Sequence, residues 1–279
     1  MISDKLMVFL LRLGRLLPVP AWSKACGSRI RTYAKKGNQV VLIYPDGQRK
    51  RCPFLWLPRG IVIDFHGNNN TLEFEVPSSS PKEIKQYLKR FHSLSFIFYE
   101  DGNCCHFGVT KYKFIYEGSS LTLHNAAKMT FGRNFCLGHN SILYANGLDG
   151  AEFTVGDDCA IAGDAVVRND DAHTIFDVQT RDILNRPRGL RLGNHVWVTF
   201  RCTLLKGTSL PDNTIVGCGT ICTKAFTEPN TIIAGMPPRV VRRGVSWSIS
   251  SISEFQAEQA EQSVQDNAER VTTDIDAEL

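Results

Sequence analysis

The sequence lacks the features that mark several common classes of protein. No apolar run reaches the ~18 residues that a membrane-spanning helix needs, so we expect no such helix. The N-terminal apolar stretch is interrupted by Arg12 and Arg15 and is not followed by a small-residue cleavage site, which argues against a signal peptide. No lysine- and arginine-rich run or nucleic-acid-binding motif is present, so nucleic acid is not an expected partner.

Among the nine cysteines, no pair has the CxxC spacing of zinc or redox sites. Their number is odd and their spacing is irregular, which is typical of small buried thiols in a reducing compartment. We therefore expect a cytoplasmic protein whose cysteines are free thiols.

Charge is distributed unevenly along the chain. The net charge is +4, but residues 251–279 contain eight acidic residues and one basic residue, so the first 250 residues carry about +11. A basic body suits an anionic partner, such as a nucleotide cofactor or an acidic glycan. The acidic segment is also rich in glutamine and alanine, and we expect it to be a terminal helix or disordered.

Residues 2–17 carry apolar side chains at helical spacing, and Pro18 ends the segment. Lys5, Arg12 and Arg15 decorate the apolar stripe. Two interpretations remain open. The helix packs on its own domain, or its basic flanks hold it against an anionic membrane.

A period of six residues begins at Phe131, after strand-like stretches between residues 60 and 123 and a short helix expected to begin at Ser80-Pro81. The aliphatic or aromatic positions of this period are Phe131, Leu137, Leu143, Val155, Ile161, Val167, Leu192, Val198, Leu204, Leu210, Val216 and Cys222. Small or β-branched residues commonly follow four positions later, as at Ser141 and Cys159.

A six-residue unit can form one short face and one corner of a triangular coil, with the aliphatic side chain inside and the small side chain beneath the corner. Three units close a coil of about 18 residues, and coils stack through parallel strand pairing. The pattern predicts an all-β solenoid, a left-handed parallel β-helix, over residues 60–245. An N-terminal amphipathic helix and irregular cap would occupy 1–59, and the acidic tail 246–279.

Three stretches resemble the hexapeptide-repeat acyltransferases, and among them the O-acetyltransferases of bacterial capsule and surface polysaccharides. They are NDDAHTIFD at 169–177, RLGNHVWVTFRCTLLKGTSLPDNTIVGCGTICTK at 191–224 and EPNTIIAGMPPRVVRR at 228–243. The resemblance covers residues 120–245. It implies direct transfer of an acetyl group from acetyl-CoA to a sugar hydroxyl, in a homotrimer whose active sites lie between subunits.

The resemblance assigns the general base to His173. Histidine suits this role because it can accept the proton of the acceptor hydroxyl near neutral pH. The regular hexads stop beside it, and a loop over 176–191 would overhang a neighbouring groove. Asp171 is the predicted partner of the second ring nitrogen, with Asp170 and Asp177 as alternatives. Without this role, His173 would merely hydrogen-bond a corner of a coil.

Trp197 resembles a family tryptophan beside the acceptor and the pantetheine path, where a flat indole offers an apolar wall. Packing on the outer face alone is the alternative, and neighbouring His195 is interpreted as structural. Thr199 departs from the family pattern, which has a small residue whose amide contacts the acyl end of the cofactor. Thr199 still offers an amide by this reasoning, although its side chain adds bulk.

The resemblance places the acetyl-CoA groove nearer the C-terminus. Gly217 allows close backbone approach, and Lys224 corresponds to a lysine near the nucleotide end of CoA. Arg239, Arg242 and Arg243 follow the AGMPP loop, where cations can pair with the cofactor's phosphates. For each single cation, a solvated surface charge is the alternative.

Four arginines lie in or beside the 176–191 loop, at positions 181, 186, 188 and 191. Arg186 and Arg188 are expected to bind the acceptor, because guanidinium groups pair bidentately with carboxylates. The acceptor glycan would then be acidic, for example one that contains sialic acid. A peripheral contact with the inner membrane or the capsule-synthesis machinery remains open.

Some β-helices of this kind are zinc carbonic anhydrases, which use three histidines, two of them five residues apart. The seven histidines of this chain include no such pair, so no metal is expected. Two other functions remain open. One is acylation of an amino sugar or a small metabolite, and the other is a non-catalytic scaffold or glycan-binding module, which the departure at Thr199 keeps in view.

Overall fold

The computed structural model describes residues 29–32, 36–58, 60–112 and 117–277. The chain divides into two units, Met1–Val245 and Ser246–Leu279. The helix expected at residues 2–17 lies outside the described residues.

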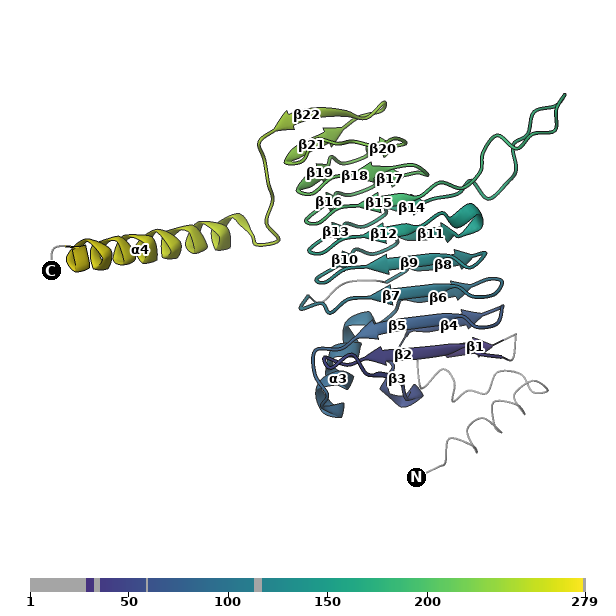
Figure 1. Cartoon of the computed structure of the whole chain (residues 1–279), viewed down its shortest axis with the longest axis horizontal. Coiled ribbons are helices and arrows are strands. Elements are labelled where there is room, and N and C mark those ends of the chain that lie inside the picture. Colours follow the sequence, from purple (N-terminus) through teal and green to yellow (C-terminus); the bar gives the residue numbers. More distant parts are fainter. Residues whose placement is uncertain (1–28, 33–35, 59, 113–116, 278–279) are drawn as a thin grey trace. The chain divides into compact units, whose positions relative to one another are not determined.

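The first unit is built from three sheets of short strands (Figure 1). Sheet A contains β1 (Arg29–Thr32), β4 (Val62–Phe65), β6 (Ser95–Phe98), β8 (Ser120–His124), β11 (Ile142–Asn146), β14 (Val166–Arg168), β17 (Thr203–Leu204) and β20 (Ile221–Cys222). Sheet B contains β3 (Arg49–Arg51), β2 (Gln39–Ile43), β5 (Thr71–Glu75), β7 (Cys104–Phe107), β9 (Lys128–Phe131), β12 (Phe153–Val155), β15 (Leu190–Leu192) and β18 (Ser209–Leu210). Sheet C contains β10 (Cys136–Leu137), β13 (Ala160–Ile161), β16 (Trp197–Val198), β19 (Thr214–Val216), β21 (Thr231–Ala234) and β22 (Arg239–Arg243).

From β9 to β20 the chain visits the sheets in the repeating order B, C, A. Over this range neighbouring strands of each sheet pair in parallel, so that Trp197 lies beside Ile215, 18 residues later, and Thr203 beside Ile221. The pairs β2–β3 and β21–β22, at the ends of sheets B and C, are antiparallel. Three sheets visited in turn enclose a core of triangular cross-section. The architecture is the predicted parallel β-helix.

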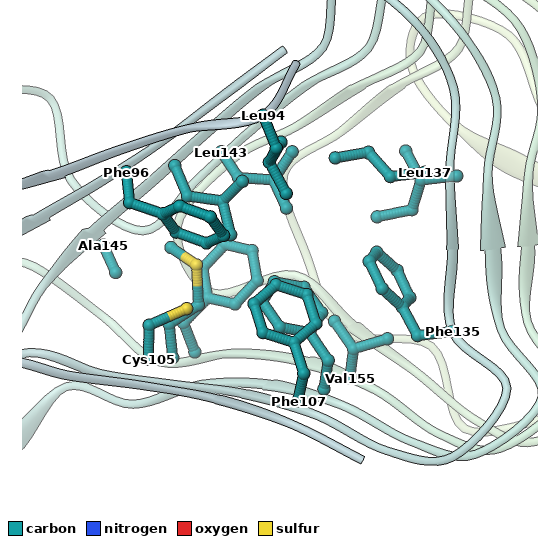
Figure 2. Packing of buried hydrophobic residues seen from close by; sticks show 14 of the residues in the cluster. Leu94, Phe96, Cys105, Phe107, Phe135, Leu137, Leu143, Ala145 and Val155 are labelled. Carbon is teal, nitrogen blue, oxygen red and sulfur yellow. The ribbon is translucent and has the colours of Figure 1, made fainter. Parts of the chain in front are cut away.

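The residues of the six-residue period fill this core. All twelve are at most 3% exposed. Figure 2 shows Phe107, Leu137, Leu143 and Val155 pointing toward one another inside the coils. The residue three positions after most of them has a left-handed backbone, at Asn134, Asn140, Asp158, Asp164, His195, Arg201, Gly207, Asn213 and Gly219. Glycine and asparagine adopt this conformation most readily, which explains their frequency at the corners.

The β-helix begins before residue 60, which corrects the predicted boundary. Strand β1 pairs with β4 in parallel, and β2 pairs with β5. The six-residue period is hidden here because the early coils are longer. Val62 and its register partner Ser95 are 33 residues apart, whereas Thr203 and Ile221 are 18 apart.

A helix occupies part of the connection that leads from β5 in sheet B to β6 in sheet A, where later coils carry sheet C. Helix α3 (Pro81–Leu88) has proline in its first turn, as expected, and continues as a 3-10 turn, η2 (Lys89–Phe91). Ser80 makes no capping bond through its side chain. The helix buries Ile84, Tyr87 and Leu88, and thereby closes the core on this side.

The second unit contains helix α4 (Ile252–Ala277), so the acidic tail is helical over this range. Ser251 begins it with a capping box, in which Glu254 N donates to Ser251 Oγ (3.3 Å) and Ser251 N donates to Glu254 Oε2 (2.7 Å). The bonds from Ser251 hold the pKa of Glu254 below its ordinary value. Within the described ranges, no helix has both the length and the apolar character needed to cross a bilayer.

Candidate active site

A long arm replaces one corner of the β-helix. Strand β14 of sheet A ends at Arg168 and β15 of sheet B begins at Leu190, and Figure 1 shows the connection projecting from the stack. One coil earlier, the same corner carries the short turn η3 (Leu148–Gly150). Both interruptions of the six-residue period therefore fall at the corner between sheets A and B, which we call the A–B corner.

The arm is a narrow hairpin with a rising limb (residues 170–176) and a returning limb (residues 183–189). Phe176 and Ile183 form an antiparallel bridge, and Leu184 N donates to Ile175 O (2.8 Å). At the tip, the Arg181 guanidinium lies 4.0 Å from the centre of the Phe176 ring. Arg181 therefore lies at the far end of the arm.

His173, the predicted base, lies on the rising limb and is exposed. Its ring forms no hydrogen bond to any residue that the structure describes. Asp171, the predicted partner of that ring, instead accepts from Lys206 Nζ and from Asn185 Nδ2 (3.0 Å). Burial alone would raise the pKa of Asp171, but the bonds from Lys206 and Asn185 hold it below its ordinary value. The predicted pairing of Asp171 with His173 is therefore absent from this chain.

The two alternative carboxylates are also occupied. Backbone N–H groups of Thr180 (2.9 Å) and Gln179 (2.8 Å) donate to Asp177 Oδ1 and hold the pKa of Asp177 below its ordinary value. Asp170 is nearly buried at the root of the arm and accepts from Asn146 Nδ2 (3.0 Å). Asp177 shapes the tip of the arm, and Asp170 anchors its root.

A cationic hollow lies at the base of the arm. Its volume is about 290 Å³, and it is lined by Ile183, Leu184, Arg186, Arg188 and Lys206. Arg186 Nη1 donates to Asp149 Oδ2 (2.9 Å), which links the arm to η3. Arg188 is exposed and crosses the Gly207 corner, where an added Cβ would lie 3.2 Å from its Cζ. The structure therefore brings Arg186 and Arg188 together, while Arg191 lies apart from them in β15.

Trp197 begins a file of side chains on the outer face of sheet C. The register pairs Trp197 with Ile215, Ile215 with Ile232, and Ile232 with Arg242. Trp197 is 37% exposed, whereas Ile215 beside it is 8% exposed. Register partners on neighbouring strands point to the same side, so an apolar strip runs from the indole to a guanidinium over about 14 Å at ordinary strand spacing.

Thr199 and Gly217 lie in consecutive turns at the corner between sheets C and A. Thr199 N donates to Val216 O (3.1 Å), and its hydroxyl donates to the same oxygen (2.7 Å). The expectation that the Thr199 amide is available to an acyl group is therefore wrong for this chain. Gly217 N donates to Ile233 O (2.7 Å), and a Cβ at Gly217 would lie 3.0 Å from Ala234 Cβ. Both amides belong to the ladder between coils.

The remaining predicted cations are not gathered at one place. Lys224 follows β20 at the A–B corner, where its Nζ lies 5.3 Å from the centre of the Phe226 ring. Arg243 Nε donates to Glu228 Oε1 (2.7 Å), so its charge is balanced. Arg239 and Arg242 are exposed on β22, and neither forms an ion pair within the described part of the chain.

The structure thus separates the predicted site residues into two groups. His173, Asp171, Arg186, Arg188 and Lys224 lie at the A–B corner. Trp197, Thr199, Gly217, Arg239 and Arg242 lie on sheet C or at the corner that follows it. In a triangular cross-section the A–B corner is opposite sheet C, so one chain does not bring the two groups together.

His195 has the structural environment expected of it. Its backbone is left-handed (φ 55°) at the corner before β16, and its Nδ1 lies 2.7 Å from Asn213 Oδ1 in the next coil. Asn213 occupies the equivalent corner with the same backbone conformation. The pair supports the stacking of two turns.

Sequence reasoning missed Asn185 and Lys206, which join the arm to the β-helix. Lys206 lies 35 residues from Asp171, and Asn185 lies 14 residues from it. Asn185 lies outside the three family stretches, and Lys206, although it lies within 191–224, is not one of the periodic core positions. Only the fold brings them together.

Among the described residues, no group of three or more histidine, cysteine, aspartate or glutamate side chains is arranged to hold a metal ion. The chemistry of the A–B corner is that of one exposed imidazole and several cations.

The chain is similar in sequence to several known sugar O-acetyltransferases. A galactoside O-acetyltransferase of Escherichia coli K12 is 28% identical over 136 residues, which are 47% of this chain and 65% of that protein. A polysialic acid O-acetyltransferase of Escherichia coli O1:K1 is 27% identical over 107 residues, 38% of this chain and 34% of that protein. A polysialic acid O-acetyltransferase of Neisseria meningitidis is 32% identical over 90 residues, 32% of this chain and 40% of that protein.

The chain resembles sugar O-acetyltransferases. Among solved structures, the polysialic-acid-specific acetyltransferase NeuO superposes with a TM-score of 0.57 at 20% identity, covering 84% of this chain and 99% of that one. The predicted resemblance and the left-handed β-helix are thereby confirmed. No protein-family model matches the chain, and the chain spans less than two thirds of the length of each curated relative.

Proposed function

We propose that this chain is an O-acetyltransferase that moves an acetyl group from acetyl-CoA to a hydroxyl of a bacterial surface polysaccharide. The observation that carries the proposal is the exposed His173, on an arm beside a cationic hollow, in a β-helix similar to sugar O-acetyltransferases. Two of the relatives are named for polysialic acid and one for a galactoside.

His173 acts as the general base. It takes the proton of the acceptor hydroxyl as that oxygen attacks the thioester carbonyl carbon. The new C–O bond forms, the C–S bond breaks, and the proton passes from the imidazole to the departing sulfur. Transfer is direct, so no covalent enzyme intermediate forms. The ring suits this role because it is exposed and no described residue occupies its nitrogens.

The hollow at the base of the arm binds the acceptor. Arg186, Arg188 and Lys206 surround it, and two of these cations already have carboxylate partners in Asp149 and Asp171. Arg188 is then the cation best able to pair with a carboxylate of the glycan. An acidic polymer such as polysialic acid fits this arrangement better than a neutral one.

The outer face of sheet C binds the acyl donor. The strip from Trp197 through Ile215 and Ile232 offers an apolar wall for a pantetheine chain, and Arg242 at its end can pair with phosphate. Arg239 adds a second cation on the same strand. These residues fit an acyl-CoA, which supplies the activated acetyl group.

The active enzyme is a homotrimer with its sites between copies. One chain holds its base at the A–B corner and its donor strip on the opposite side, so the arm of one copy must approach sheet C of the next. Closed rotational symmetry makes such contacts equivalent in every copy.

The protein works in the cytoplasm. The eight described cysteines are free, and five of them are buried. Burial raises the pKa of the Cys52, Cys136, Cys159 and Cys222 thiols to about 12, which keeps them protonated. Buried reduced thiols are typical of a reducing compartment. Attachment to the inner membrane would depend on residues 2–17.

The test is release of free CoA from acetyl-CoA with polysialic acid, a galactose-containing neutral glycan, an amino sugar or no acceptor. We expect release with polysialic acid, and a loss of about 10²- to 10⁴-fold in His173→Ala. His92→Ala is the matched control, because His92 is also exposed but lies in an early coil far from the arm in sequence.

Each other outcome assigns a different function. Release with the amino sugar alone would indicate an N-acyltransferase. No release with any acceptor, together with no binding of CoA, would favour a scaffold or glycan-binding module. Full activity of His173→Ala would show that His173 is not the general base.

A further inference from the structure

The side-chain amide of Asn185 joins the two limbs of the arm around His173. Its Nδ2 donates to Asp171 Oδ2 (3.0 Å) and to His173 O (2.7 Å), and its Oδ1 accepts from Ile175 N (2.7 Å). Three alternate residues of the rising limb are thus held by one side chain on the returning limb. Both N–H bonds and the carbonyl of the amide are used.

A single lysine ties this arrangement to the β-helix. Lys206 follows β17 in the next coil, and its Nζ donates to Asp171 Oδ2 and to Asn185 O (2.9 Å). Its side chain is 15% exposed, so this ion pair is better shielded from solvent than a surface pair. Lys206 therefore contacts both limbs of the arm at once.

The orientation of the His173 ring depends on this support because the ring itself makes few contacts. No described residue bonds its nitrogens, and the side chain is exposed. The direction in which the ring leaves the arm is then set by the backbone of residues 171–175. Asn185 holds that backbone directly at His173 O and Ile175 N, and holds Asp171 through its carboxylate.

We infer that Asn185 is a positioning residue for His173, and that Lys206 fixes Asn185 and Asp171 to the β-helix. The inference rests on the proposed function of His173 as base. It also gives Asp171 a different role from the predicted one. Asp171 is an anchor of the arm, and it acts on the ring only through the backbone. Displacement of a reacting group by about 1 Å can lower a rate about 100-fold, so the effect falls on turnover.

The experiment compares Asn185→Ala and Asn185→Asp with the wild type. Aspartate keeps the acceptor for Ile175 N but cannot donate to Asp171 or His173 O. We expect kcat to fall about 10- to 100-fold in both variants, with KM for acetyl-CoA unchanged and the midpoint of the pH–rate profile unmoved. A role limited to stability would lower the melting temperature without this separation of kcat from KM.

Variants of Lys206 test the same inference without changing a residue of the arm. Lys206→Met should lower kcat in the same way, and Lys206→Arg should restore much of it because a cationic donor remains. The double variant Asn185→Ala/Lys206→Met should be no worse than either single variant, because both break one network. Asn38→Ala is the matched control, since the Asn38 amide also donates to a carbonyl and accepts from an N–H, in the first coils.

Limited trypsin digestion measures how firmly this hydrogen-bond network holds the arm, and it does not depend on enzyme activity. Arg181 and Arg188 provide cleavage sites on the arm, whereas the Arg186–Pro187 bond resists trypsin. We expect faster cleavage at these two sites in Asn185→Ala and Lys206→Met than in Asn38→Ala. If the wild type releases no CoA with any acceptor, the proposed function fails and the digestion alone decides whether the network holds the arm. Wild-type kcat in both Asn185 variants, or unchanged cleavage of the arm, would overturn the inference.

Discussion

His173 and Trp197 lie on opposite sides of the β-helix, although 24 residues separate them in the sequence. His173 extends from the A–B corner, and Trp197 lies in β16 on sheet C. The residues that resemble a catalytic base and a donor-binding wall thus lie apart within one chain. The proposed homotrimer would bring them together between copies.

This separation predicts complementation between two inactive variants. His173→Ala lacks the base and Trp197→Ala lacks the wall, but a mixed assembly contains contacts between an intact arm and an intact sheet C. With random mixing of equal amounts, about a quarter of the sites are intact, and acceptor-dependent CoA release should return to about that fraction of wild type. Copies are mixed by co-expression, and the assembly is verified by its mass.

Mixing Trp197→Ala with the double variant His173→Ala/Trp197→Ala is the control, since no intact site can form. Activity in the first mixture that does not exceed the sum of its separate components would show that each chain holds a complete site.

The charge of Arg188 should select acidic acceptors. Arg188→Ala removes a cation of the hollow that has no carboxylate partner among the described residues, so KM for polysialic acid should rise about 10-fold, while KM for a neutral glycan and for acetyl-CoA stays the same. Arg191→Ala is the matched control, because Arg191 lies in β15 outside the hollow. Equal changes with acidic and neutral acceptors would mean that Arg188 does not contact the glycan carboxylate.

The coils after residue 128 could be predicted closely because their physics is local. Each hexad places its periodic side chain inside, and most hexads have one residue in a left-handed turn. The twelve periodic residues between Phe131 and Cys222 could therefore be assigned to the core before any contact was known. The early coils could not be predicted from the six-residue period because their connections are longer and one of them contains α3. There, alternation within a strand is visible, but the period that links strands is not.

The site could be predicted only as a list of residues. The family stretches name His173 and Trp197, but nothing in them states that one lies opposite the other. The sequence predicts a pairing of Asp171 with His173 because the two are near each other in the chain, whereas in the structure Asp171 accepts from Lys206, 35 residues away. Contacts across corners depend on which coils stack on one another. The sequence of the arm has no repeat, so the residues that it contacts cannot be calculated from a period.

Phe107 should be the most costly aromatic residue to remove from the early coils. It is 2% exposed, and its ring centre lies 4.6 Å from that of Phe131, 5.4 Å from that of Phe91 and 5.6 Å from that of Phe74. Phe107→Ala should lower the free energy of unfolding by about 3–5 kcal/mol in denaturant titrations. Leu55→Ala, at an 80% exposed side chain, should change it by less than about 0.5 kcal/mol.

A smaller loss at Phe107, near that of Leu55, would mean that the core of the early coils relaxes around the missing ring.

His124 should make stability depend on pH. Its ring is stacked between those of Tyr99 (4.5 Å) and Tyr144 (4.9 Å), and its Nδ1 lies 3.2 Å from Glu100 Oε2. Burial lowers the pKa of His124 from the ordinary 6.5 by more than the negative charges of Glu100 and Asp170 raise it. Below about pH 6.5 the unfolded chain therefore binds a proton that the folded chain resists, and stability falls as the pH falls. Thermal midpoints of wild type and His124→Gln, measured from pH 7.5 to 5, should diverge, with a shallower fall in the variant.

His92→Gln, which replaces an exposed ring, is the control, and its midpoints should follow those of the wild type. If the His124→Gln curve runs parallel to the wild-type curve, groups other than His124 cause the pH dependence of stability.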